Sequence, residues 1–169
     1  MARRRGTAQQ LHAEDVATYV AAGGEESVQR VITAVYAVTK KLDQWYVRQF
    51  ADLDLTQGEW SVLAALAKAG DTCLTPSQLA DLSNVAPSSM THRLDKMAGR
   101  GLVKRTPDET NRTRTLVSLT KEGWALFSAA IRESNVVESD TLRGLSGKER
   151  HELARLLEIV IAGLDDVPD

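Results

Sequence analysis

The sequence has one cysteine, no long apolar run and almost no net charge, and each of these features excludes or disfavours a class of protein. Cys73 has no second cysteine to pair with, which excludes a disulfide-stapled secreted fold and favours the reducing cytoplasm. A membrane-spanning helix needs roughly 18 consecutive apolar residues, and no such stretch is present. Residues 1–6 are basic, but no apolar segment follows them, so we do not expect a secretory signal.

The formal net charge of −2 argues weakly against a nucleic-acid-binding protein, because such domains are often basic. The average hides an uneven distribution along the chain. Residues 84–115 hold seven basic and three acidic side chains, a net charge of +4, which leaves −6 for the rest. Charge concentrated in one region indicates a function for that region, although basic residues on a helix and a hairpin can also form an ordinary solvated face.

A long helix is predicted over residues 25–52. Its apolar residues recur at spacings of three and four for about seven turns, and no glycine or proline interrupts them. Such a helix is roughly 40 Å long, which exceeds what a domain of this size covers, so we expect it to pack on a partner chain. A shorter amphipathic helix within residues 1–24 precedes it and ends at Gly23 and Gly24.

Further helices are predicted from capping signals and one hairpin from β-branched segments. Thr56, Thr75 and Ser146 each begin a capping box, and Pro87 occupies a favourable first-turn position. Residues 102–106 and 114–119 are strand-like, and the polar segment 107–113 joins them. Thr120 begins another helix. Two short helices followed by a basic hairpin predict a winged helix-turn-helix, which places its second helix in the major groove of DNA.

We therefore expect a mainly α fold (α+β) with a winged helix-turn-helix between long N- and C-terminal dimerisation helices. Residues 1–24 are predicted to form an arm or short helix, and residues 25–53 a dimerisation helix. Residues 54–120 form the predicted DNA-binding region, and residues 121–169 the C-terminal dimerisation helices.

The winged-helix region resembles the MarR family of bacterial transcriptional regulators. The resemblance covers residues 55–123 without a gap and depends on several blocks in the right order. These blocks are Leu55-Thr56-x-x-x-Trp60-x-Val62-Leu63, Leu74-Thr75-x-x-x-Leu79-Ala80, Met90-Thr91-x-x-Leu94-Asp95, Arg100-Gly101-Leu102-Val103-x-Arg105, Asn111-Arg112 and Val117-x-Leu119-Thr120-x-x-Gly123. The family's wing tip usually reads Asp-Arg-Arg, whereas this chain has Asn111-Arg112-Thr113, which keeps the first arginine only.

The predicted recognition helix spans residues 87–98. Met90, Leu94 and Met97 face the core, so the opposite face is available to DNA. Serine hydroxyls donate and accept hydrogen bonds and suit several base edges, and a proline ring can meet a thymine methyl group. The alternative is that the serines are ordinary first-turn residues. The candidate contacts of this helix are Pro87, Ser88, Ser89, His92 and Arg93.

Arg112 is the first candidate for insertion into a minor groove, whose narrow A·T-rich form attracts arginine; the alternative is a solvated loop arginine. The resemblance implies that Asp95 pairs with the wing arginine and orients the wing. Phosphate contacts position a protein without reading its sequence. The candidates for that role are Lys104, Arg105, Arg114 and Thr75.

A small-molecule effector is a separate prediction. Trp45, Arg48 and Asp52 share one face of the long helix, where an indole, a guanidinium and a carboxylate could bind a planar anion. The alternative is a core tryptophan beside an exposed ion pair. The sequence around Trp45 and over residues 88–105 is most similar to the urate-responsive branch of the family. The three histidines are scattered and flank no cysteine pair, so we expect no metal site and no cofactor.

The function expected from these features is that of a homodimeric repressor that binds a pseudo-palindromic double-stranded DNA operator in the cytoplasm, with half-sites about 10 bp apart. No catalytic constellation is present, so we expect no enzyme activity. The alternative function is a helical dimerisation or protein-interaction module that does not read DNA, because the wing motif is incomplete and the rest of the chain is acidic.

Overall fold

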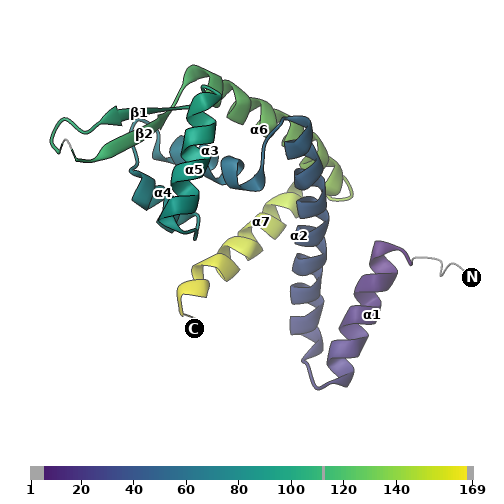
Figure 1. Ribbon diagram of the computed structural model, residues 1–169. Helices are drawn as coiled ribbons and strands as arrows, with labels where there is room; N and C mark the ends of the chain where they lie inside the picture. The colour runs from purple at the N-terminus through teal and green to yellow at the C-terminus, as the bar shows by residue number, and fades with distance from the viewer. Residues whose placement is uncertain (1–5, 112, 167–169) are drawn as a thin grey trace, which may run out of the picture.

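The chain is mostly helical and carries one small β-hairpin, which confirms the predicted fold class (Figure 1). The computed structural model describes residues 6–111 and 113–166. No helix in these residues is both long enough and apolar enough to cross a membrane. In chain order the elements are α1 (Ala8–Ala21), α2 (Glu26–Asp52), α3 (Gln57–Ala69), α4 (Pro76–Leu82), α5 (Pro87–Gly99), β1 (Val103–Pro107), β2 (Thr115–Leu119), α6 (Lys121–Thr141), α7 (Gly147–Ala162) and the 3₁₀ turn η1 (Leu164–Asp166).

Helix starts follow the capping chemistry of the sequence. At Thr56, Thr75 and Ser146 the hydroxyl accepts a hydrogen bond from the backbone N–H three residues later, and that later side chain accepts from the cap N–H. These reciprocal bonds satisfy two otherwise unpaired donors at each start. Thr7 begins α1 in the same way with Gln10. Helix α5 has no side-chain cap and begins instead at Pro87, whose fixed φ suits a first helical turn.

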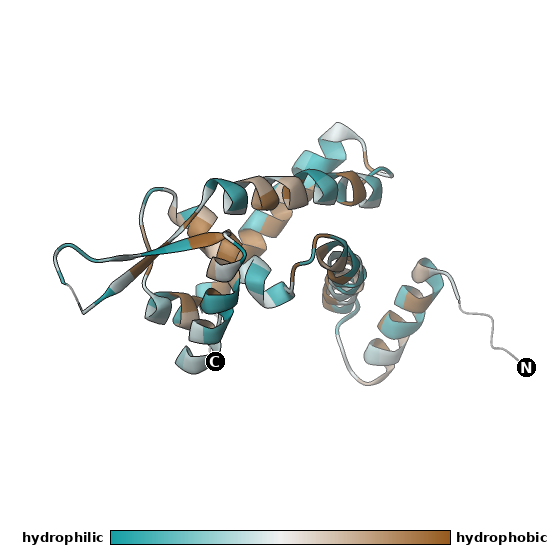
Figure 2. Cartoon of the chain, turned by 45° about the horizontal axis from the view of Figure 1, so that its top comes forward, coloured by the Kyte–Doolittle hydropathy of each residue, from teal (hydrophilic) through white to brown (hydrophobic). Residues whose placement is uncertain are grey.

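The core lies where α3, α4, α5 and the hairpin meet, and it appears as the brown segments in the middle of Figure 2. Met90, Leu94 and Met97 are fully buried, as the sequence predicts for the inner face of the recognition helix. Their counterparts on the neighbouring elements are the fully buried Leu63, Leu79 and Val117. The position of α5 is therefore fixed from its inner side, which leaves its outer side for contacts with a partner.

The hairpin has a third, very short neighbour. Strands β1 and β2 pair antiparallel, with Val103 opposite Leu119 and Pro107 opposite Thr115. Leu74, just before α4, exchanges two backbone hydrogen bonds with Val117, at N–O distances of 3.1 and 2.7 Å. The sequence does not predict this contact because a single bridging residue has no alternation pattern. It ties the helix-turn-helix to the base of the wing.

Gly123 allows α6 to touch the chain that enters the wing. A Cβ added at this position would lie 2.1 Å from the carbonyl oxygen of Leu102, which is a backbone atom. We expect Gly123→Ala to lower the free energy of unfolding by about 1–3 kcal/mol, the usual cost of overpacking a tight interior. Urea denaturation measures this loss. Gly99→Ala is the matched control, because nothing lies within 4 Å of its added Cβ; equal stability of the two variants would contradict the prediction.

Helix α2 meets the core only through its C-terminal part. Its Tyr46 and Phe50 begin a stacked series that continues through Trp60 of α3 to Phe127 of α6, with ring centroids 5.1–6.2 Å apart. Burial, and a hydrogen bond that the Tyr46 hydroxyl donates to Glu138, raise the pKa of Tyr46 to about 12. The buried Gln49 amide donates to the carbonyl oxygen of Ala130 at 2.7 Å. These contacts connect the long helix to the winged-helix region.

The apolar stripe of α2 is largely exposed. Five of its predicted members have between 43% and 52% of their surface accessible, namely Val28, Val31, Ile32, Val35 and Val38. Every residue of α7 is exposed as well, including Leu153, Leu156 and Val160. Figure 1 shows α7 (yellow) as a separate helix that leads to the C-terminus. The described chain thus leaves two long apolar helix faces uncovered.

Candidate nucleic-acid interface

The outer side of α5 presents small and basic side chains. Pro87, Ser88, Ser89 and His92 are all exposed. Because the first two turns carry no bulky apolar residue on this side, a flat surface such as a base-pair edge can approach the helix closely. The wing projects beside this helix (Figure 1). The structure therefore brings four of the five predicted recognition-helix residues to one open surface.

Arg93 is placed differently from those four residues. Its side chain is half-buried and lies against the first turn of α3, where a Cβ on Gly58 would be only 2.5 Å from the guanidinium carbon. Gly58 therefore leaves the space that the guanidinium occupies. A shallow hollow at this junction is lined by Arg93, His92 and Lys96 among others. Arg93 consequently contributes positive charge close to the outer face of α5 while it packs against α3.

An ion pair joins the recognition helix to the wing. Arg105 of β1 donates to Asp95 Oδ1 at 2.7 Å and to the carbonyl oxygen of Thr91 at 3.1 Å. Asp95 thus contacts the wing through β1. The pairing of Asp95 with the wing arginine, which the family resemblance implied, involves Arg112 outside the described residues and stays a prediction. Arg105 was predicted as a phosphate contact, but two of its guanidinium nitrogens are already engaged within the protein. These bonds connect β1 of the wing to α5, and a phosphate contact by Arg105 stays a prediction.

Two side-chain turns shape the wing loop. Asp108 Oδ1 accepts from the backbone N–H of Thr110 at 2.8 Å, and Asn111 Oδ1 accepts from that of Thr113 at 3.1 Å. Hydrogen bonds from the Thr110 hydroxyl and backbone lower the pKa of Asp108. Asn111 replaces the family's usual aspartate, and its amide oxygen still accepts these bonds. Arg112 itself lies outside the described residues, so its predicted insertion into a groove stays a prediction.

A cleft separates the start of α4 from the returning strand of the wing. It has a volume of about 510 Å³ and is lined by Thr75, Ser77 and Arg114 among others. Arg114 is exposed, as a phosphate contact requires. Thr75 is only 9% exposed, and its hydroxyl both accepts from the backbone N–H of Gln78 and donates to the Gln78 side chain. The structure therefore gives Thr75 a capping role, and the exposed Ser77 is the hydroxyl that faces outward here.

A second ionic cluster, which the sequence analysis did not predict, fixes the end of α5. Arg100, the residue that follows this helix, lies 3.1 Å from Glu59 and 3.3 Å from Asp54. Glu59 is buried and also caps α3, whereas Asp54 has a positive φ of 50° in the turn after α2. Arg100 thus joins the recognition helix to the junction of α2 and α3. Only its place in the family block Arg100-Gly101-Leu102 could have singled it out.

Glu59 makes the stability of this junction pH-dependent. Burial raises the pKa of Glu59, but hydrogen bonds from Thr56 and the charges of Arg100 and Lys96 outweigh burial, so the pKa is lowered overall. Because the pKa of Glu59 is lower in the folded protein than its unfolded value of about 4.3, the ionised carboxylate stabilises the fold above that pH. This stabilisation is lost as the pH falls through the folded-state pKa. We expect Glu59→Gln to reduce stability at pH 7 and to flatten its decline below pH 5. Urea denaturation across pH measures this; Glu133→Gln, at an exposed position on α6, is the control. An unchanged acid decline would contradict it.

The predicted effector residues do not form a bonded cluster. Trp45 is half-buried, and its ring meets Tyr46 edge-on with centroids 5.6 Å apart. Arg48 and Asp52 are both exposed. Within the described part of the chain no ion pair joins these two side chains. The face at Trp45 therefore stays a prediction that this geometry does not strengthen.

The fold and its residues agree with known proteins. The family model described as "MarR family" matches residues 55–115. The chain is 30% identical over 128 residues to the HTH-type transcriptional regulator PecS of Dickeya dadantii, an alignment that covers 75% of this chain and 77% of PecS. The chain belongs to the MarR family. Family membership confirms the resemblance inferred from the sequence blocks.

Solved structures of other MarR-family proteins share the architecture of this chain. A mutant of Escherichia coli MarR complexed with operator DNA is 26% identical, with a TM-score of 0.58 over 75% of this chain and 90% of that chain. A MarR family protein from Bacillus stearothermophilus has a TM-score of 0.75 at 21% identity, over 84% and 98% of the two chains. As a member of the MarR family, the protein is a transcriptional regulator.

Proposed function

We propose that this protein is a homodimeric repressor that binds a pseudo-palindromic double-stranded DNA operator and is released from it by a small ligand. The observation that carries the proposal is the open surface of α5, where Pro87, Ser88, Ser89 and His92 lie beside a basic wing. A MarR relative of the same fold was solved with operator DNA. In a winged helix-turn-helix the second helix enters the major groove and its first residues reach the base edges.

Charge supports DNA binding through the same surface. Lys104 is exposed on β1, Arg114 is exposed just before β2, and Arg93 adds charge near α5. Contacts to phosphates would set the register of the protein, and the α5 side chains would then read the bases. The acidic remainder of the chain would disfavour binding through other faces. Residues 54–120 are accordingly proposed as the DNA-binding region.

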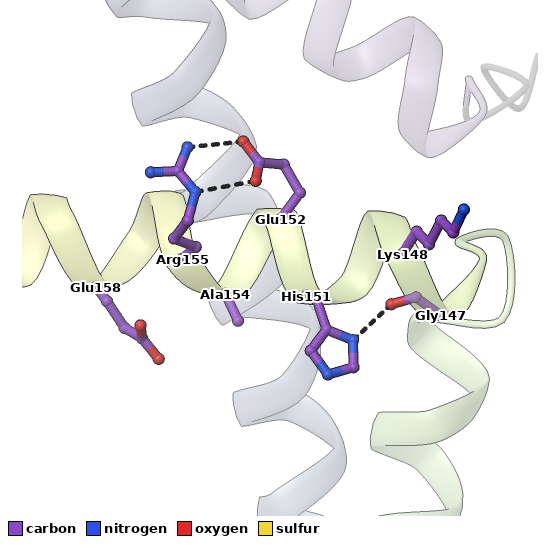
Figure 3. A pocket seen from close by; sticks show the side chains of 7 residues that line it. All are labelled: Gly147, Lys148, His151, Glu152, Ala154, Arg155 and Glu158. Carbon is purple, nitrogen blue, oxygen red and sulfur yellow. Dashed lines mark hydrogen bonds and ion pairs between the residues drawn. The ribbon is translucent and has the colours of Figure 1, made fainter.

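The exposed apolar faces support a dimer. On α7 the side chains Leu153, Leu156, Leu157 and Val160 follow helical spacing on one side. The opposite side is polar, and there Arg155 donates two hydrogen bonds to Glu152, as Figure 3 shows. A helix with one polar and one apolar side normally buries the apolar side. We propose that residues 25–53 and 121–169, with the arm of residues 1–24, pair with those of a second copy.

Repression follows from the position of such a protein on DNA. A dimer that occupies two half-sites about 10 bp apart would block access of the transcription machinery to an overlapping promoter. A ligand that binds between the dimerisation helices and the winged helices could change the half-site spacing and release the operator. The junctions at Arg100 and at Phe50 and Trp60 are the contacts through which α2 would act on α5.

Retention of operator DNA at low salt is the direct test. The operator can be found by selecting bound fragments from the source genome, and its affinity then measured by fluorescence anisotropy. Log affinity should fall steeply against log salt, because phosphate contacts release counterions. A protein that retains no double-stranded DNA at low salt would support the alternative, a dimerisation or protein-interaction module, instead.

Arg114→Gln tests the phosphate contacts. We expect the slope of log affinity against log salt to decrease by about 1 per subunit, with a uniform loss of affinity across operator sequences. Arg132→Gln removes the same charge from an exposed position on α6 and should leave the slope unchanged. If the two variants show equal slopes, Arg114 does not contact phosphate.

A further inference from the structure

The C-terminal end of α2 packs on α6 (Figure 1), and this contact contains a buried pair of polar side chains. Gln49 of α2 and Ser134 of α6 are only 4% and 5% exposed. The Gln49 amide donates to the carbonyl oxygen of Ala130 at 2.7 Å, and its oxygen accepts from the Ser134 hydroxyl at 3.0 Å. Both ends of one amide are therefore bonded to α6, at two residues that lie about one helical turn apart.

This pair joins two helices, whereas the other buried polar side chains have local roles. Among the described residues, Glu59 and Thr75 cap helices, and the Thr33 hydroxyl donates to a carbonyl of its own helix. Replacing a buried bonded pair by apolar groups of the same shape often costs little stability. Stability therefore does not explain the pair, and the best-attested use of a buried polar group is to fix how two elements are placed.

The pair lies between the region proposed to bind DNA and the helix proposed to form the dimer. Nearer its N-terminus, α6 packs on the winged helix, where Phe127 stacks on Trp60 with ring centroids 5.2 Å apart. On the other side, α2 extends from Gln49 back to Glu26, which is roughly 35 Å at 1.5 Å per residue. A change of about 5° in the angle of α2 at Gln49 would move its far end by roughly 3 Å, close to the rise of one base pair.

We propose that Gln49 and Ser134 are positioning residues that set which half-site spacing of the operator the dimer accepts. Their hydrogen bonds hold α2 at one angle on α6, so the two winged-helix regions of a dimer lie at one separation. Tyr46 supports the same angle one turn earlier on α2, where its hydroxyl donates to Glu138 at 2.6 Å. The inference rests on the homodimeric DNA binding proposed above and deepens it, because it names the residues that select the spacing.

The test compares the wild type with the double variant Gln49→Met, Ser134→Ala on operators whose half-sites are moved apart by one base pair. Both substitutions nearly keep the side-chain volume and leave no side-chain polar group unpaired, so urea denaturation should show similar stability. We expect the affinity of the wild type to fall by at least about tenfold on the altered operator, and that of the double variant by about threefold or less. The ratio of the two affinities is the readout, because a loss of packing alone would weaken binding to both operators equally. Gln57→Met, Ser139→Ala removes the same groups at exposed positions and should keep the wild-type ratio.

A second measurement needs no DNA. Spin labels on Glu122→Cys, in a Cys73→Ser background, report the distance between the exposed first turns of the two α6 helices in a dimer. Double electron–electron resonance should give one narrow distance distribution, which the double variant broadens. If the double variant does not fold, Gln49→Met alone replaces it in both measurements, because the Ser134 hydroxyl can then bond to the carbonyl four residues earlier in its own helix.

Equal affinity ratios in the variant and the wild type would overturn the proposal, and so would equal distance distributions. A wild-type protein that binds both operators equally well would overturn it as well. Each of these results leaves the proposed repressor in place. Absence of any operator binding by the wild type refutes the repressor and the spacing proposal together, so the two failures can be told apart.

Discussion

Leu157→Glu is expected to convert the protein to monomers and to abolish binding to a two-half-site operator. Leu157 lies in the middle of the apolar side of α7, and 37% of its surface is accessible. If a second copy covers this side, the substitution removes about 1.5–3 kcal/mol of apolar burial from each subunit. It also places a carboxylate on a surface that the proposed dimer buries, and a buried unpaired charge costs more than the lost burial.

The expected rise in the dimer dissociation constant is at least about 100-fold, since each tenfold step corresponds to about 1.4 kcal/mol. Sedimentation equilibrium across protein concentration measures it. His151→Glu introduces the same charge on the polar side of α7, where Figure 3 labels His151, and should leave the dimer intact. Because every residue of α7 is exposed in the single chain, neither substitution should unfold it, and circular dichroism checks this. If both variants stay dimeric, α7 does not form the interface.

The positions of the elements could be predicted from the sequence because their signals are local. Capping boxes at Thr56, Thr75 and Ser146 involve residues three apart, and each appears as expected. The inner face of α5 follows from the spacing of Met90, Leu94 and Met97. Spacing also predicts the long α2, because apolar residues that recur at intervals of three and four fall on one side of an α-helix.

The partners of charged side chains could not be predicted, because these pairs join residues far apart in the chain. The sequence offers Asp95 several arginines, and only the fold selects Arg105. Likewise Arg100 and Glu59 are 41 residues apart, and nothing local indicates their contact. The need for glycine at two positions could not be predicted either. Gly58 faces the guanidinium of Arg93 and Gly123 faces the carbonyl oxygen of Leu102, and both groups are distant in the sequence.

The exposed apolar stripe of α2 agrees with the prediction made from the sequence. The sequence assigned the α2 stripe to a partner because the helix is too long for its domain. The structure shows Val28, Ile32 and Val35 exposed, as that argument requires.

Ser89→Glu is expected to abolish operator binding without affecting the fold or the dimer. Ser89 is the third residue of α5 and is exposed on the surface proposed to enter the major groove. A carboxylate there would face the negative potential of the DNA phosphates. Each half-site should lose about 1–3 kcal/mol, and a dimer contacts two. The affinity at low salt should therefore fall by about 30-fold or more.

Protein stability should move in the opposite direction, which separates loss of DNA contact from loss of fold. A negative charge in the first turn of a helix interacts favourably with the helix dipole, and α5 has no acidic residue in its first turn. Urea denaturation of Ser89→Glu should thus show equal or higher stability than the wild type. Ser89→Gln has nearly the same size without the charge, and we expect it to lose about tenfold or less. If Ser89→Glu binds the operator as tightly as Ser89→Gln does, this turn of α5 does not approach DNA.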